Sequence, residues 1–183
     1  MAGEAVCKPG ALVADDAALA LAPGTGSHVS RGGLKLEAAL ETFGLDPQGR
    51  VALDVGASTG GFTDVLLQRG AAKVFAVDSG TNQLAWSLRD DERVIVLEQT
   101  NARHLTATEI PEPVDFVVCD ASFISLAKVL ETPLSFARVG AKLIALIKPQ
   151  FEAGRDEVGK GGVVRDPAVH RRVCEAAGDW LAT

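Results

Sequence analysis

The chain has 183 residues, of which 47% are apolar and 5% aromatic, and its formal net charge is −6. This length and apolar content predict one compact domain with a sizeable core plus a short appendage, and the acidic net charge argues against a protein that binds nucleic acid over its whole surface. The apolar runs are too short to span a membrane and no N-terminal segment resembles a signal peptide, so we expect a cytoplasmic protein without membrane contact.

Residues 1–29 are rich in Ala, Gly and Pro and end in the sequence PGTGSHV, a composition typical of a flexible connector. We therefore expect an appendage or linker over residues 1–29 and the folded domain over residues 30–183. The domain is predicted to begin with a helix, because Leu36, Leu40 and Phe43 recur at helical spacing and Gly44 follows as a C-cap.

Five apolar runs then predict the strands of a sheet, at residues 51–56, 73–78, 94–99, 114–120 and 142–148. Segments of helical length separate them, and in the first of these segments Phe62, Val65 and Leu66 share a face. Near-continuous apolar strands that alternate with helices favour a parallel sheet covered on both sides. The sequence thus predicts an α/β fold with a doubly wound, mainly parallel sheet.

The segment after the fifth run, residues 150–167, is too rich in glycine and charge for a core element. We expect a mobile loop here, whose Arg155, Lys160 and Arg165, together with Arg31, would be available to the phosphate groups of a ligand. An ordinary solvated loop is the alternative. Asp166 followed by Pro167 predicts the start of a last helix, whose Val169, Val173 and Trp180 would face the sheet.

Cysteine and histidine spacing predicts neither a metal site nor a disulfide. Cys7, Cys119 and Cys174 are widely separated, and the three histidines stand apart from them.

Polar or small residues stand at the ends of the predicted strands, where ligands bind to sheets of this class. They are Asp54, Gly56, Asp78, Asn101, Asp120 and Lys148. After the first strand, the turn from Gly56 to Gly61 is small enough for the backbone to approach a ligand, although the glycines would also suit a plain tight turn. Asp54 would orient this turn or accept a hydrogen bond from a ligand amine, and Asp78 stands where an acidic residue binds a ribose diol.

Two nucleotide-binding patterns fit this turn badly. A dinucleotide fingerprint would place a glycine at Ser58, and a phosphate-binding loop would place a lysine after Gly61. The stretch LDVGASTGGFT instead resembles the first motif of S-adenosylmethionine-dependent methyltransferases. That resemblance implies S-adenosylmethionine as cofactor, bound by Asp54, Gly56, Ser58, Gly60, Gly61, Phe62, Asp78, Asn101 and Asp120.

Six motifs in order extend the resemblance over about residues 29–172: SRGGLKL, LDVGASTGGFTD, AVDSGTNQLAWSLR, CDASFIS, LIKPQFEAG and GKGGVVRD. Together they resemble the TlyA (hemolysin-like) family of ribosomal RNA ribose 2′-O-methyltransferases, relatives of the FtsJ RNA methyltransferases. The resemblance implies a Rossmann-like fold, and ribosomal RNA or a ribosomal subunit as partner. The phosphates of that RNA would be bound by Arg31, Arg155, Lys160 and Arg165. It also implies that residues 1–29 are the remnant of an RNA-binding module.

The family's catalytic pattern is Lys-Asp-Lys-Glu, and the resemblance places its first three members at Lys35, Asp120 and Lys148. Taken singly, these residues would also suit a surface lysine, a helix cap and a strand-end lysine that reaches water. Taken together, they suit a site in which Lys148 orients or deprotonates a ribose 2′-hydroxyl while Asp120 holds its ammonium.

No residue matches the fourth member, because Glu152 and Glu157 are misplaced for it. We expect a sheet that stops after the fifth strand and its following helix, with the C-terminal strands missing and the fifth strand at an exposed edge. Two functions therefore stay open: methyl transfer from S-adenosylmethionine to a ribose 2′-hydroxyl of ribosomal RNA, or a truncated homologue that binds cofactor or RNA without catalysis. Membrane lysis, which the hemolysin name suggests, finds no supporting amphipathic basic segment.

Overall fold

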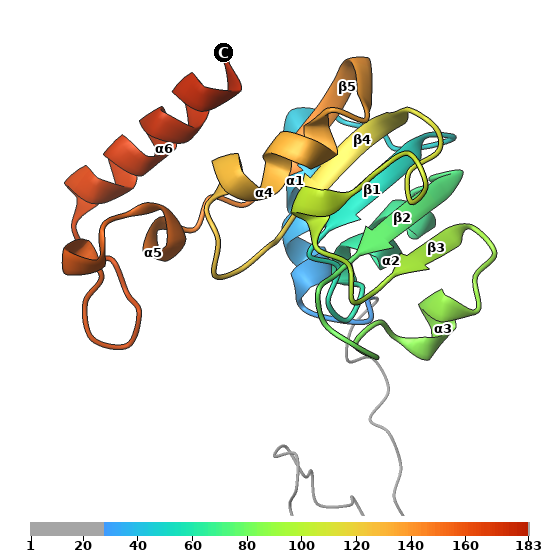
Figure 1. Cartoon of the computed structure of the whole chain (residues 1–183), viewed down its shortest axis with the longest axis horizontal. Coiled ribbons are helices and arrows are strands. Elements are labelled where there is room, and N and C mark those ends of the chain that lie inside the picture. Colours follow the sequence, from blue (N-terminus) through green and yellow to red (C-terminus); the bar gives the residue numbers. More distant parts are fainter. Residues whose placement is uncertain (1–27, 183) are drawn as a thin grey trace, which may run out of the picture.

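The computed structural model describes residues 28–182, and the expected appendage over residues 1–29 lies almost wholly outside them. Five strands form one sheet in the order β3-β2-β1-β4-β5, with all neighbours parallel (Figure 1). The strands are β1 Val51–Val55, β2 Lys73–Val77, β3 Val94–Leu97, β4 Val114–Cys119 and β5 Ala137–Ala145. The predicted α/β fold with a parallel, doubly wound sheet is confirmed.

The helices alternate with the strands along the chain. They are α1 Gly32–Phe43, α2 Gly61–Gln68, α3 Trp86–Arg89, α4 Leu126–Leu134, α5 Pro149–Glu152 and α6 Pro167–Leu181, with short 3-10 turns η1 Ala102–His104 and η2 Arg155–Glu157. No helix among residues 28–182 is long and apolar enough to cross a membrane.

Successive strand residues point to opposite faces, which divides the core in two. On one face, Ala52 and Val74 pack with α1 and α2, and the predicted apolar face of α2 is buried there. On the other face, Leu53 and Phe75 pack with η1 and α4. The sheet is thus covered on both sides, and its carboxyl ends are left for the site.

One predicted core residue is wrong. Leu36 and Leu40 are buried as expected and Gly44 ends α1 in a left-handed conformation, but Phe43 is 68% exposed. After Gly44 the chain turns back, and Leu45 donates its backbone N–H to the Leu40 carbonyl and packs against the core. This contact is common beyond a glycine-capped helix end, and here it puts Leu45 rather than Phe43 against the core.

Two strand boundaries also differ from the sequence prediction. β3 ends at Leu97, because the next residue, Glu98, turns its carboxylate to backbone N–H groups of residues 82–84. β5 begins earlier than predicted, with an irregularity in its pairing to β4, and ends at Ala145. Lys148 therefore lies beyond the strand, at the N-cap of α5.

The segment after β5 is more ordered in its local structure than the predicted loop. It contains α5, η2 and a bridge between Gly159 and Val163. α6 begins as expected, with the Asp166 carboxylate accepting a hydrogen bond from the Ala168 N–H. The expectation that its apolar residues face the sheet is wrong for two of them, because Val169 and Val173 pack in a small separate cluster with Val164. Figure 1 shows α6 standing apart from the strands.

Candidate active site

Three residues from distant parts of the chain meet at the carboxyl end of the sheet. Asp120 directly follows β4, Lys148 follows β5, and Lys35 comes from the first half of α1. The Lys35 Nζ lies 2.9 Å from Asp120 Oδ2, and the Lys148 Nζ lies 2.6 Å from Asp120 Oδ1. A single carboxylate thus bridges two ammonium groups, so the structure brings together the three residues that the catalytic pattern selects.

The two lysines differ in how firmly they are held. The Lys148 Nζ also donates to the Asp120 backbone oxygen at 3.0 Å and to the Ser122 Oγ at 2.9 Å. The ammonium thus makes two hydrogen bonds, and its short approach to Asp120 Oδ1 is an ion pair rather than a hydrogen bond. The Lys148 side chain is 18% exposed against 52% for Lys35. Lys148 is therefore fixed in place, unlike a strand-end lysine extended to water.

Two adjoining clefts open around Asp120. The first has a volume of about 510 Å³ and is lined by Asp78, Asn101 and Asp120 among others. The second, of about 280 Å³, is lined by Lys35, Phe62, Gly61 and Lys148 among others. Both are lined by Gly56, Ser58, Asp120 and Ser122, so they meet at these residues. The first cleft has the size of a small-molecule site.

Asp78 ties the loop after β1 to the end of β2. Its Oδ2 accepts a hydrogen bond from the Ser58 N–H at 2.8 Å, and its Oδ1 accepts one from the Gly80 N–H at 2.7 Å. Ser58 has a positive φ of 49°, an uncommon conformation that this contact helps to hold. Each carboxylate oxygen has a second lone pair, so Asp78 keeps acceptor capacity toward the first cleft.

Asp54 is fully buried and lines neither cleft. Its Oδ2 accepts a hydrogen bond from the Thr63 hydroxyl at 2.7 Å, whereas its Oδ1 has no hydrogen-bond partner in the described part of the chain. Burial raises the pKa of Asp54 to about 7, the Thr63 contact opposes this, and the negative charges of Asp120 and Asp78 add to it. Of the two predicted roles, the geometry favours orientation of the turn and α2 over contact with a ligand amine.

The raised pKa gives a prediction for stability. Because folded Asp54 binds its proton more tightly than the unfolded chain does, its contribution is present at low pH and is lost as pH rises from about 4 to about 7. In urea titrations the free energy of unfolding of the wild type should fall relative to that of Asp54→Asn over this pH window, by on the order of 4 kcal/mol in total. Parallel pH profiles for the two proteins would show that Asp54 titrates normally.

Gly60 does not face either cleft. It has a φ of 96°, and a Cβ there would lie 2.2 Å from Leu88 Cδ1 and 2.8 Å from Leu84 Cδ1. The expectation that Gly60 leaves room for a ligand therefore gives way to a packing role against Leu84 and Leu88. Gly56, with a φ of 84°, lines both clefts, and a Cβ on it would lie 2.9 Å from the Ala121 Cα at the end of β4.

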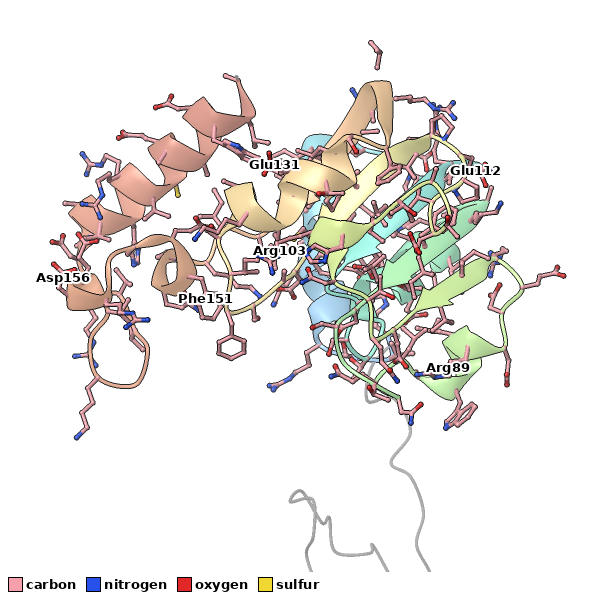
Figure 2. All side chains as sticks on the ribbon, viewed as in Figure 1. Arg89, Arg103, Glu112, Glu131, Phe151 and Asp156 are labelled. Atoms are coloured by element: carbon pink, nitrogen blue, oxygen red, sulfur yellow. The ribbon has the colours of Figure 1, made fainter. Side chains whose placement is uncertain are left out.

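Of the remaining predicted residues, some lie at the clefts and others do not. Asn101 lines the first cleft and caps η1, where its Oδ1 accepts a hydrogen bond from the Arg103 N–H. Arg31 is exposed at the N-cap of α1, and its two sequence neighbours, Ser30 and Gly32, line the second cleft. The other three predicted RNA-binding residues are exposed but line neither cleft: Arg155, Lys160 and Arg165. Figure 2 shows the neighbouring Asp156 beyond Phe151, on the side away from Arg103.

Sequence reasoning missed Glu98, which shapes a wall of the first cleft. Its carboxylate accepts hydrogen bonds from the N–H groups of residues 82–84 at 2.7–3.0 Å and lies 2.6 Å from Arg89 Nη2. The Arg89 hydrogen bond, followed by the backbone contacts, lowers the pKa of Glu98 to about 2. Gln83, which this carboxylate holds, lines the cleft. The signal in the sequence was an acid that interrupts the apolar run VIVLE.

Glu98→Gln should lower the free energy of unfolding by about 2 kcal/mol at pH 7, because it removes a charged acceptor with several partners. A carboxylate with a lowered pKa stabilises the fold above pH 4.5 and loses this contribution as pH falls toward 2. The difference between variant and wild type should shrink over that range in urea titrations. Glu92→Gln, on an exposed residue nearby, is the control, and an equal effect of both variants would contradict the assigned role.

Phe123 is a second residue that the sequence did not reveal. It lines the first cleft with a φ of 66° and is 90% exposed, and its ring centroid lies 5.1 Å from that of Phe151 in α5. Positive φ is a genuine outlier for a bulky side chain, and such strain concentrates at functional sites. The rim of the first cleft thus carries an exposed aromatic side chain directly after Ser122.

Comparison with known proteins supports a family assignment. The sequence model described as FtsJ-like methyltransferase matches residues 28–182. The chain belongs to the FtsJ-like methyltransferase family. Its fold is accordingly that of S-adenosylmethionine-dependent methyltransferases, and the predicted resemblance to TlyA proteins is confirmed by the relatives.

The 16S/23S rRNA (cytidine-2′-O)-methyltransferase TlyA of Mycobacterium tuberculosis is 54% identical over 166 residues, which cover 90% of this chain and 62% of that protein. Hemolysin A of Brachyspira hyodysenteriae is 44% identical over 156 residues, which cover 82% of this chain and 63% of that protein. A solved structure named "putative hemolysin" from Streptococcus thermophilus matches with a TM-score of 0.82 and 46% identity. The match covers 87% of this chain and 58% of that structure's chain. The FtsJ-like chain thus spans less than two thirds of the length of these relatives.

Proposed function

We propose that this chain carries the centre for methyl transfer from S-adenosylmethionine to a ribose 2′-hydroxyl of ribosomal RNA. The observation that carries the proposal is the Asp120 carboxylate, which lies between the ammonium groups of Lys35 and Lys148 at the junction of two clefts. Membership in the FtsJ-like family supports it, and so does the name of the Mycobacterium tuberculosis relative.

The first cleft suits the cofactor. Its volume of about 510 Å³ fits a nucleoside ligand, and Asp78 offers carboxylate oxygens with spare acceptor capacity for a ribose diol. Gly56 and Ser58 line both clefts and bring the backbone of the turn to the junction. When bound, S-adenosylmethionine supplies a methyl group on a positively charged sulfonium.

The second cleft would receive the acceptor ribose beside Lys148. In the reaction, a bond forms between the 2′-oxygen and the methyl carbon, the carbon–sulfur bond breaks, and the hydroxyl proton leaves. Lys148 is placed to orient the hydroxyl or to take its proton, and Asp120 holds the ammonium in position. Since the sulfonium loses its charge on transfer, alignment should supply much of the rate.

The substrate would be ribosomal RNA or a ribosomal subunit in the cytoplasm. Arg31, exposed at the N-cap of α1, is the predicted phosphate contact nearest to the clefts in the chain. Arg155, Lys160 and Arg165 would contact RNA farther from the reacting ribose, since they line neither cleft.

A specific observation also favours the second candidate, binding without catalysis. The two glutamates of the segment after β5 have other partners: Glu152 accepts a hydrogen bond from the Leu126 N–H at 2.7 Å, and Glu157 pairs with Arg172. Within residues 28–182, neither is therefore placed as a fourth catalytic carboxylate beside Lys148.

Asp78→Ala should weaken S-adenosylmethionine binding by on the order of 1–3 kcal/mol, roughly five- to 150-fold, through loss of a charged hydrogen-bond acceptor. Isothermal titration calorimetry measures this directly. Asp46→Ala serves as the control, because Asp46 accepts a hydrogen bond from the Gln48 N–H away from both clefts. Equal affinity in the two variants would count against the cofactor cleft.

Calorimetry combined with tritiated methyl transfer to ribosomal subunits separates the two candidate functions. Binding with transfer supports the methyltransferase, and binding without transfer supports the second candidate. A protein that does neither would contradict both.

A further inference from the structure

Ser122 lies at the point where the two clefts meet. It is exposed on the loop after β4 and is one of the four residues that line both clefts. Its Oγ lies 2.9 Å from the Lys148 Nζ. A hydroxyl oxygen therefore already stands within hydrogen-bond distance of the proposed catalytic ammonium, at the place where donor and acceptor would meet.

The contacts of Lys148 show what this hydroxyl adds. The Asp120 backbone oxygen at 3.0 Å and the Asp120 Oδ1 at 2.6 Å both belong to one residue, and the Asp120 carboxylate is shared with Lys35. Ser122 supplies the third oxygen and, within residues 28–182, the only one from a different residue. Without it, one N–H donor of Lys148 loses its partner and the end of a flexible side chain gains freedom.

We propose that Ser122 is a positioning residue, whose hydroxyl holds the Lys148 ammonium aimed at the cleft junction before the acceptor ribose arrives. This inference rests on the proposed function, because it assigns Ser122 a part in the alignment of Lys148 with the acceptor hydroxyl. Small misplacements of a reacting group cost large factors in rate, so the loss of one restraint should be measurable in turnover.

The test compares Ser122→Ala with Ser122→Thr, which keeps a hydroxyl, in the full encoded protein. Ser122→Ala should lower kcat about tenfold with KM for cofactor and RNA within about twofold, and Ser122→Thr should return kcat to within about twofold of the wild type. Because Ser122 is exposed, neither change disturbs the core. Turnover of Ser122→Ala equal to or faster than the wild type would overturn the proposal, as would equal losses in both variants.

A second readout does not depend on methyl transfer. In ¹⁵N-detected spectra of lysine ammonium groups, the Lys148 signal, assigned by its loss in Lys148→Arg, should broaden in Ser122→Ala and sharpen again in Ser122→Thr. An unchanged signal in Ser122→Ala would contradict the contact itself. If the wild type transfers no methyl group, the proposed function fails and the positioning role fails with it; if the wild type is active and Ser122→Ala matches it, only the inference about Ser122 fails.

Discussion

Lys148→Ala is expected to lower methyl transfer by at least about a hundredfold while S-adenosylmethionine affinity changes by less than about threefold. Lys148 lines the second cleft and not the first, and its ammonium is held by Asp120 and Ser122 at the junction. Its loss should therefore affect the acceptor hydroxyl rather than the cofactor. Turnover is measured with tritiated cofactor and affinity by calorimetry.

Lys142→Ala provides the matched control for this experiment. Lys142 is also a lysine of the β5 region, but it is exposed and lines a different pocket together with Arg50 and Asp115. We expect its turnover to stay within about twofold of the wild type. Substantial methyl transfer by Lys148→Ala, or an equal loss in both variants, would refute a catalytic role for Lys148.

Gly60→Val should lower the free energy of unfolding by about 2–6 kcal/mol. Two costs combine: a β-branched residue at a φ of 96°, and a Cβ that would lie 2.2 Å from Leu88 Cδ1. Such a loss is a large fraction of the stability of a typical domain. Urea unfolding followed by circular dichroism measures it.

Gly140→Val separates the two costs of that change. Gly140 has a φ of 84° but nothing within 4 Å of a Cβ, so this variant carries the backbone strain alone. Its loss should be about 1–3 kcal/mol. If the two variants lose equal stability, then the contact with Leu84 and Leu88 adds nothing to the cost of a side chain at Gly60.

Much of the architecture could be predicted from the sequence because the strands are buried on both faces. Each appears as a continuous apolar run, and the helix after β1 shows its buried face in Phe62, Val65 and Leu66. The convergence of Asp120 and Lys148 follows from the same pattern, since both come after the carboxyl ends of parallel strands. Placing Lys35 beside them required the family motif, because helical periodicity says nothing about which strand a helix end approaches.

What could not be predicted depends on contacts between segments. Glu98 and Ser122 are ordinary residues in the sequence, and their roles arise from backbone N–H groups of residues 82–84 and from the ammonium of Lys148. The exposure of Phe43 depends on the turn after Gly44, which brings Leu45 against the core instead. The local sequence pattern shows which positions are apolar or polar. It does not show which distant residue each side chain will contact in the fold.

We propose that Asp120, Lys35 and Lys148 form a ribose methyltransferase centre, and nucleoside analysis of the methylated RNA tests this proposal most directly. Ribosomal subunits are incubated with the full encoded protein and methyl-labelled S-adenosylmethionine, the RNA is digested to nucleosides, and the labelled product is identified by mass spectrometry. We expect a labelled 2′-O-methyl nucleoside with the wild type and none with Lys148→Ala. Label on a base, or the same 2′-O-methyl product at wild-type level from Lys148→Ala, would contradict it.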